Sequence, residues 1–330
     1  MPAPSSATAT TTTTTATTRG AAREDRVPWT GVAAYVVVAL GLAWLVALPL
    51  WTGGGPTDPR FRLLALAMML TPTVAAVGVT LTLLRPAQPW RSLGLVPGVG
   101  WRRLVVLGLV GLLAPVLLSA LVLLVAGGTG LAGVDWSLGA YAANLTASGT
   151  PLPPAVPPRT IALVTLAAVP LNALVSAVPV AAEEIGWRGF LLPRLLPLGT
   201  GPALLVSGVV WGAWHAPLVL LGYDYGRRDA LGVLLMVGFC VLVGVGLGAL
   251  RLRSGCVWPG AVAHGCVNTV APAVLLVFSP EPARGVGLTL LGPTGWVVLA
   301  GLAVVLALTG ALRRPAPGAS NAEGAPTGPR

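Results

Sequence analysis

The sequence predicts an all-α polytopic membrane protein with about eight transmembrane helices and cytoplasmic N and C termini. Of the 330 residues, 55% are hydrophobic and only 9% are charged. A soluble domain carries roughly 25% charged residues, so this chain lacks the polar surface that water requires. Its apolar residues also recur in runs of about 20, the length that a helix needs to cross the hydrocarbon core of a bilayer.

The chain divides into five segments. Residues 1–28 are a Thr-rich cytoplasmic tail of low complexity, which cannot build a core and is expected to be disordered. Residues 29–158 are expected to hold three membrane helices and a long loop rich in Gly, Pro and Thr. Residues 159–279 hold a second group of helices, and 280–314 the last membrane helix. The Pro-, Ala- and Gly-rich residues 315–330 are expected to form a second disordered tail.

Each apolar run is interpreted as one membrane span. The fourth is the least regular, because apolar sequence continues from Ile161 to Leu198, which is too long for one straight helix. The expected spans are 29–51, 61–84, 104–126, 160–182, 200–222, 230–250, 257–279 and 288–312.

The arginines give the orientation. All 20 basic residues are arginine, and the formal net charge is +10. With both termini in the cytoplasm, 14 of the 20 arginines lie inside, in agreement with the positive-inside rule. The arginines occur singly or in pairs at the ends of apolar runs, without the basic and aromatic clusters that bind nucleic acid, so no nucleic-acid partner is expected.

The candidate functional residues are the ionisable side chains inside apolar sequence, since intramembrane charge is costly and usually functional. Only Glu183 and Glu184 among the acids lie there, and both histidines, His215 and His264, also lie within expected spans. At about 1.5 Å per residue, Glu183, His215 and His264 all lie about 16 to 18 Å from the inner ends of their spans. These three side chains are therefore expected near one plane in the membrane.

Local spacing refines this set. Glu184 and Arg188 are four residues apart and face the same way on a helix, so they can form an ion pair. Glu183 is turned about 100° from Glu184, so the two carboxylates need not share a role. His264 and Asn268, also four apart, place an imidazole and an amide on one face. Trp211 and Trp214 are interpreted as packing residues.

Three short motifs carry a family resemblance. The segment from Glu183 to Gly189, EEIGWRG, resembles the EExxxRG motif of the CPBP intramembrane proteases. This family joins type II CAAX prenyl proteases and bacteriocin-processing or self-immunity proteins. WGAWH, ending at His215, and HGCVN, from His264 to Asn268, resemble its second and third motifs. Together they cover roughly residues 165–275, so the segment 159–279 is expected to be the catalytic core.

The resemblance implies an intramembrane endopeptidase that hydrolyses a bond in a membrane-proximal peptide or protein. Glu183 would activate water with the help of His215, while His264 and Asn268 would stabilise the oxyanion. Glu184 and Arg188 would be a supporting ion pair. The composition indicates a bacterial multi-pass protein of the plasma membrane, with the bilayer as its surroundings and its oligomeric state open.

Three alternatives remain open from the residues. Two histidines and a glutamate are a common zinc set, which would make Glu183, His215 and His264 metal ligands. The ligands would come from three separate spans without an HExxH pair, so the metal-free mechanism is favoured and no cofactor is expected. A proton- or ion-coupled transporter could use the same residues as a relay. A catalytically silent immunity protein could keep them for packing.

Overall fold

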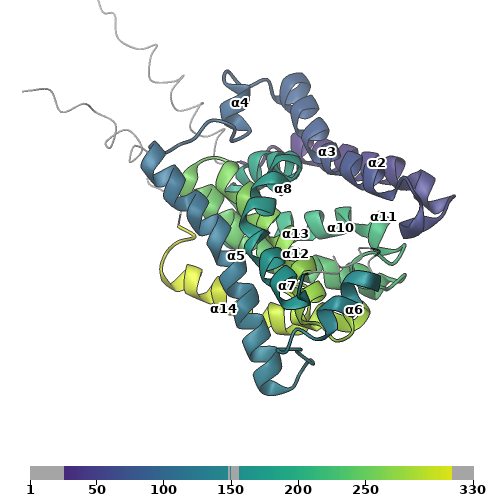
Figure 1. The fold of residues 1–330 in the computed structure, drawn as a ribbon. Coiled ribbons are helices and arrows are strands. Elements are labelled where there is room, and N and C mark those ends of the chain that lie inside the picture. The colour runs from purple at the N-terminus through teal and green to yellow at the C-terminus, as the bar shows by residue number, and fades with distance from the viewer. Residues whose placement is uncertain (1–25, 148, 150–155, 314–330) are drawn as a thin grey trace, which may run out of the picture.

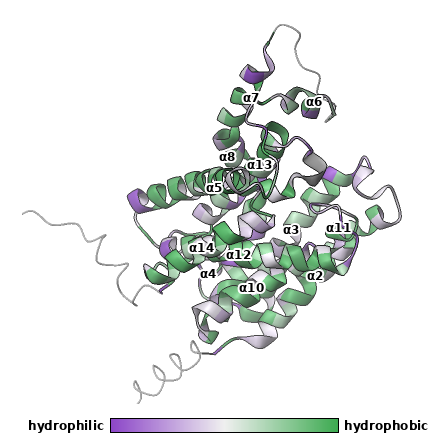
Figure 2. Cartoon of the chain, turned by 90° about the horizontal axis from the view of Figure 1, so that it is seen from below, coloured by the Kyte–Doolittle hydropathy of each residue, from purple (hydrophilic) through white to green (hydrophobic). Residues whose placement is uncertain are grey.

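The computed structural model describes residues 26–147, 149 and 156–313. The expected tails, 1–28 and 315–330, lie almost wholly outside this part of the chain. The described residues are mainly helical and contain no strand, as the composition predicts. Figure 2 shows apolar residues along most of the length of the helices, with hydrophilic residues mainly at their ends and in the connections.

Six helical segments are long and apolar enough to cross a membrane. A seventh candidate is a broken pair, formed by Pro158–Ala167 (α7) and the helical stretch Val169–Leu198, which bends by 46°. Pro170 in the first turn after the break explains the bend, because proline disfavours helical geometry in the residue before it. The six are α2 (Trp29–Trp51), α3 with its π-helical end (Phe61–Leu84), α5 (Trp101–Thr129), α12 (Ala230–Ser254), α13 (Trp258–Phe278) and the segment Gly285–Leu308 that contains α14 (Pro293–Leu308).

The segment 200–222 differs from the single span expected there. Its helix α10 (Thr200–Trp214) ends after 15 residues, and the short α11 (Ala216–Val219) follows His215. Pro217 begins this new turn, and a proline cannot donate the backbone hydrogen bond that a continuous helix needs. His215 therefore lies at a break between two helices rather than inside a span.

The expected long loop 127–158 also contains regular structure. Helix α5 continues to Thr129, and α6 (Ala140–Ala147) follows. Asp135 accepts hydrogen bonds from the Ser137 hydroxyl and from the backbone N–H of Ala140, the latter at 2.7 Å, and these bonds hold the pKa of Asp135 below its usual range. Asn144 donates to the carbonyl of Ser279 at 2.8 Å, which ties α6 to the end of α13. Residues 148 and 150–155 lie outside the described part.

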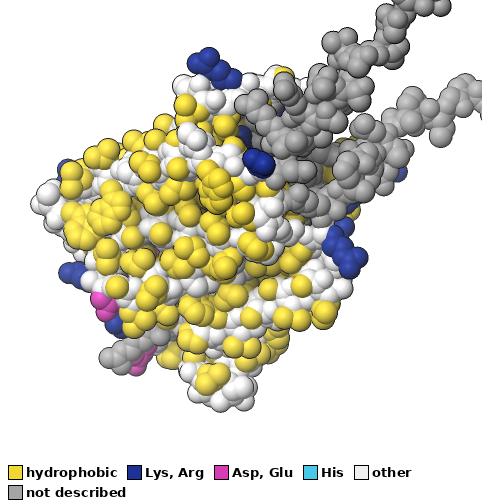
Figure 3. Space-filling view, turned by 180° about the vertical axis from the view of Figure 1, so that it is seen from behind, with side chains coloured by type: hydrophobic (Ala, Val, Ile, Leu, Met, Phe, Trp, Pro, Cys, Tyr) yellow, Lys and Arg dark blue, Asp and Glu magenta, His cyan; other side chains and the backbone are white. Residues whose placement is uncertain are grey.

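The helices pack around α13 and α8 (Val169–Glu184), which make the most extensive helix–helix contact. Helix α13 lies between α5 and α8, α8 also contacts α3, and α3 contacts α2 (Figure 1). Helix α12 contacts α10 on one side and α13 and α14 on others. On the face shown in Figure 3, hydrophobic side chains are spread across the described surface and charged side chains lie mainly toward its edges, as expected for a protein surrounded by lipid.

Small residues bring the central helices close together. A Cβ atom added to Gly265 of α13 would lie 2.7 Å from the carbonyl oxygen of Ala173 in α8. Gly208 and Gly212 of α10 face the backbone of Val241 and Val237 in α12 at 2.6 and 2.4 Å on the same measure. Such small-xxx-small spacing lets membrane helices approach closely. The motif residues on α8, α10 and α13 are thereby brought into one region.

Candidate active site

The first motif lies where α8 changes its helical geometry. Glu183 and Glu184 are the last two residues of α8, and residues Ile185–Leu191 form a π-helical segment that contains Arg188. Such π segments are rare and often occur at functional sites. Gly189 is required here, because an added Cβ would lie 2.3 Å from the carbonyl oxygen of Leu93.

Glu184 is the most completely enclosed ionisable group of the site. Its Oε1 atom accepts a hydrogen bond from Arg188 Nη1 at 2.7 Å and another from His264 Nδ1 at 2.9 Å. All three side chains are buried. The structure thus contains the Glu184–Arg188 pair that the spacing predicts. It adds His264, which lies 80 residues away in sequence, as a second donor to the same oxygen.

Glu183 points to a different neighbour, as its rotation relative to Glu184 predicts. Its Oε2 atom accepts a hydrogen bond from the indole nitrogen of Trp211 at 3.1 Å. Among the described residues, none donates a hydrogen bond to its Oε1 atom. The carboxylate is buried. Trp211 holds its Oε2 atom, and its Oε1 atom has a lone pair available to a water molecule.

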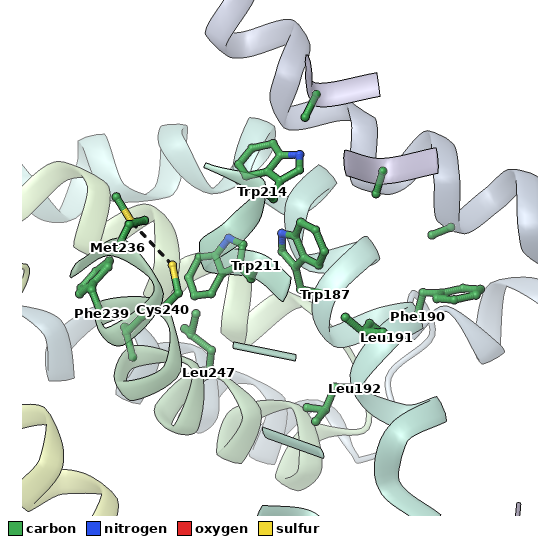
Figure 4. Close-up of a cluster of buried hydrophobic side chains, with 14 of the residues drawn as sticks. Trp187, Phe190, Leu191, Leu192, Trp211, Trp214, Met236, Phe239, Cys240 and Leu247 are labelled. Atoms are coloured by element: carbon green, nitrogen blue, oxygen red, sulfur yellow. Dashed lines mark hydrogen bonds between the residues drawn. The ribbon is translucent and has the colours of Figure 1, made fainter. Parts of the chain in front are cut away.

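Trp211 connects the two glutamates. The guanidinium of Arg188 lies over its ring, 4.1 Å from the centroid, and the ring of His264 packs edge-on at 5.0 Å. A cation over an aromatic face is stabilised by the ring quadrupole, more strongly where water is excluded. Figure 4 shows Trp211 between Trp187 and the α12 side chains Cys240 and Met236. The indole therefore fixes the arginine and Glu183 relative to each other.

His215 lies beside this indole at the break between α10 and α11. Its Nδ1 atom is 3.0 Å from the carbonyl oxygen of Trp211, and its ring packs edge-on against Trp214 at 4.8 Å. Because a carbonyl can only accept, Nδ1 carries the proton. In the neutral ring Nε2 is then an acceptor, available to a water molecule or a substrate. The Cys240 sulfur also lies near the His215 ring, 3.9 Å from Nδ1.

Asn268 is the candidate that the structure connects least. It lies one turn after His264 on α13, but its side chain is exposed, whereas His264 is buried. Within the described part of the chain it makes no hydrogen bond to Glu183, His215 or His264. The structure therefore brings five of the six candidates into one connected group around Trp211 and leaves Asn268 at its edge.

The zinc alternative would require Glu183, His215 and His264 to converge on one ion. No group of three or more His, Cys, Asp or Glu side chains among the described residues is placed to hold a metal ion. Glu183, His215 and His264 are neighbours through Trp211 rather than around a common point. His264 Nδ1 donates to Glu184, so its Nε2 atom is the one that could bind a metal ion.

Trp211 is the site residue that sequence reasoning assigned only to packing. A signal for its role was present, since an indole N–H buried in apolar surroundings normally has an acceptor. The nearest acidic residues inside apolar sequence are Glu183 and Glu184, on another helix. Which of the two carboxylates would accept could not be read from spacing within one helix.

Comparison with known families supports the resemblance seen in the motifs. Residues 162–270 match the family described as type II CAAX prenyl endopeptidase Rce1-like. The matched segment contains all six candidate residues and excludes α2, α3, α5 and α6. No match was found among curated proteins. The matched family is one of CAAX prenyl endopeptidases, and the long apolar helices are those expected of a multi-pass membrane protein.

Proposed function

We propose that this protein is an intramembrane endopeptidase in which Glu183 activates a water molecule for attack on a peptide carbonyl. The observation that carries the proposal is the state of this carboxylate. It is buried, Trp211 holds its Oε2 atom, and no described residue bonds its Oε1 atom. A carboxylate fixed in this way is positioned to accept a proton from water, as a general base does.

His215 assists in this proposal. Its Nδ1 proton is directed to the Trp211 carbonyl, which leaves Nε2 as the hydrogen-bond acceptor of the neutral ring. A water molecule between Glu183 Oε1 and His215 Nε2 can donate one hydrogen to each. As the water oxygen bonds to the substrate carbonyl carbon, its proton passes to Glu183. The same proton then moves to the leaving amine when the C–N bond breaks.

His264 and Asn268 are proposed to stabilise the oxyanion of the tetrahedral intermediate. His264 Nδ1 donates to Glu184, so its Nε2 atom can donate only when the ring carries both protons. The Glu184 carboxylate supplies the counter-charge for that form. Asn268 has an exposed amide one turn along the same helix, and substrate binding would bring its N–H groups into use. Donors in a site with little water stabilise developing charge strongly.

Glu184 and Arg188 position the other groups. Glu184 orients the His264 ring, and Arg188 holds the face of Trp211, which in turn holds Glu183. The substrate is proposed to be a peptide or membrane protein that reaches the site from the bilayer, and the protein to reside in a bacterial plasma membrane. No step requires a metal ion.

The proposal can be tested on membranes from cells that lack the protein. These are supplied with purified wild type or with Glu183→Gln, and new protein N termini are identified by mass spectrometry. Wild type is expected to create N termini within or next to membrane segments, and Glu183→Gln to create none. Asp224→Asn is the matched control, because Asp224 is an exposed loop acid with a positive φ angle that asparagine also tolerates.

Two results would contradict the proposal. One is an unchanged set of N termini with folded wild-type protein. The other is cleavage by Glu183→Gln equal to that of wild type. Each variant must elute as a monodisperse species in detergent before it is compared.

A further inference from the structure

A second feature of the molecule lies away from the glutamate site. An apolar groove of about 230 Å³ runs between α5, α12 and α14, with α13 at its base. Its walls are aliphatic, and among its lining residues Arg253 alone is charged. Helices α5 and α14 flank it and lie in contact. Long apolar grooves on a lipid-facing surface are filled by whatever apolar chain is present.

The length and direction of the groove match one leaflet of a bilayer. Along α5 its lining extends from Leu107 to Leu118, which at 1.5 Å per residue is about 16 Å. Half of a hydrocarbon core is about 15 Å. The groove runs along helices that cross the membrane, so its axis is parallel to lipid acyl chains. Its dimensions suit a single acyl chain.

One end of the groove is basic. Arg253 lines this end and donates from Nε to the carbonyl of Ala311 at 3.0 Å and from Nη2 to that of Gly310 at 2.8 Å. Arg103 is one turn before Leu107 on the same face of α5, and Arg313 follows Ala311 by two residues. Both are exposed.

These three arginines have no acidic partner within the part of the chain that the structure describes. The ion pairs between described residues are Asp58–Arg60, Glu184–Arg188, Arg227–Asp229 and Glu184–His264. None of them involves Arg103, Arg253 or Arg313. The positive charge at the mouth of the groove is therefore available to an external anion. A basic rim beside an apolar channel between membrane helices is the arrangement that binds anionic lipid headgroups.

We propose that this groove binds one anionic glycerophospholipid, with an acyl chain between α5 and α14 and its phosphate at the rim formed by Arg103, Arg253 and Arg313. The acyl chain fills apolar surface that the protein leaves open, and the headgroup supplies the missing negative charge. The lipid joins α5 and α14, which are far apart in sequence. It is expected to stabilise the contact between the segment before the glutamate site and the last helix.

Native mass spectrometry of the whole protein in detergent tests this proposal. The protein is incubated with phosphatidylglycerol or phosphatidylcholine of identical acyl chains, and bound lipid is counted. Wild type is expected to retain one phosphatidylglycerol at least fivefold more than phosphatidylcholine. Millimolar inorganic phosphate alone should leave no bound adduct, which separates a lipid site from a phosphate site.

Two sets of variants separate the groove from the rim. Gly246→Leu fills the groove, because an added Cβ at Gly246 meets only Leu302 Cδ2, at 3.7 Å. This substitution should abolish retention of phosphatidylglycerol. Gly301→Leu should not, because a Cβ added at Gly301 has no neighbouring atom within 4 Å. The pair Arg103→Gln with Arg313→Gln should remove the preference for phosphatidylglycerol. The matched pair Arg62→Gln with Arg159→Gln removes equal charge from exposed positions elsewhere and should retain it.

Equal retention of the two lipids by wild type would overturn the proposal. So would unchanged retention in a folded Gly246→Leu protein. If Gly246→Leu fails to fold, the arginine pairs decide alone. The site is supported if the preference for phosphatidylglycerol is lost in Arg103→Gln with Arg313→Gln but kept in Arg62→Gln with Arg159→Gln. The same lipid preference in both pairs overturns it.

Discussion

The indole nitrogen of Trp211 in α10 donates a hydrogen bond at 3.1 Å to Oε2 of Glu183 in α8, a residue 28 positions away in sequence. This is the contact that distinguishes Glu183 from Glu184, whose donors are Arg188 and His264. The proposed base is thus held by a neutral donor and the neighbouring carboxylate by two basic groups. Each carboxylate keeps one oxygen without a described hydrogen-bond partner, but the free Oε2 atom of Glu184 is fully buried.

Replacing Trp211 with phenylalanine should therefore slow catalysis without impairing substrate binding. Phenylalanine keeps an aromatic face for Arg188 but removes the N–H. A hydrogen bond to a charged group contributes about 1.5 to 3 kcal/mol, so kcat should fall about 10-fold or more, with KM little changed. Steady-state kinetics on a substrate found by N-terminal mass spectrometry measures both constants.

Trp214→Phe is the matched control for this prediction. It also removes a buried indole N–H, but that group donates to the Thr71 hydroxyl at 3.0 Å rather than to a carboxylate. It should lower stability slightly and leave kcat within about twofold of wild type, on the general scale of a neutral hydrogen bond. Equal loss of kcat in both variants would show that Trp211 acts only through packing.

The buried pair of Glu184 and Arg188 predicts a different pattern. Arg188→Leu leaves a buried carboxylate without its main partner, which typically costs about 3 to 5 kcal/mol. The double variant Glu184→Gln with Arg188→Leu removes both charges and should recover much of that stability. Activity should stay low in both, since His264 loses its oriented carboxylate. Thermal unfolding in detergent and peptide cleavage, measured together, separate the two effects.

Recovery of activity in the double variant would contradict a positioning role for this pair. Failure to recover stability would show that Arg188 contributes mainly through its contact with the Trp211 ring. With Glu184→Gln measured alone as the second single variant, the difference between the double change and the sum of the two single changes gives the coupling energy of the pair.

Much of the fold follows from local sequence. Runs of about 20 apolar residues predict the long helices, because each backbone polar group in lipid must be paired within its own helix. The spacing of Glu184 and Arg188 predicts their ion pair for the same local reason. The bend after α7 is predicted by the apolar stretch from Ile161 to Leu198, which is too long for one straight helix across the membrane. These features depend on residues a few positions apart.

The remainder depends on contacts between distant segments or on short breaks inside apolar sequence. Pro217 divides the expected span 200–222, although its apolar character is continuous. The Trp211–Glu183 bond needs the relative rotation of two helices, which glycine contacts such as Gly208 against Val241 set. Asn268 shares a nominal helical face with His264 but is exposed. Side-chain periodicity alone does not reveal which part of a face a neighbouring helix covers.

The last glycine of the first motif predicts a purely steric effect. An added methyl group at Gly189 would lie 2.3 Å from the carbonyl oxygen of Leu93, which is backbone and cannot rotate away. Gly189→Ala should destabilise the protein by about 1 to 3 kcal/mol, as overpacking does, and reduce folded yield. Gly78→Ala, where an added Cβ meets nothing, should be neutral or slightly stabilising in its helix. Equal thermal stability of the two variants would contradict the close approach.

Metal removal gives the final prediction. The ligand set Glu183, His215 and His264 does not converge, and no other described group of His, Cys, Asp or Glu does. Purified protein dialysed against a strong chelator should therefore keep its peptidase activity, and elemental analysis should find well under one zinc per chain. A zinc site would use His264 Nε2, because Nδ1 donates to Glu184 at 2.9 Å, and would need Glu183 and His215 to move toward the same point. Loss of activity on chelation, restored by stoichiometric zinc and absent in Glu183→Gln, would show that the three side chains converge on a metal ion during catalysis.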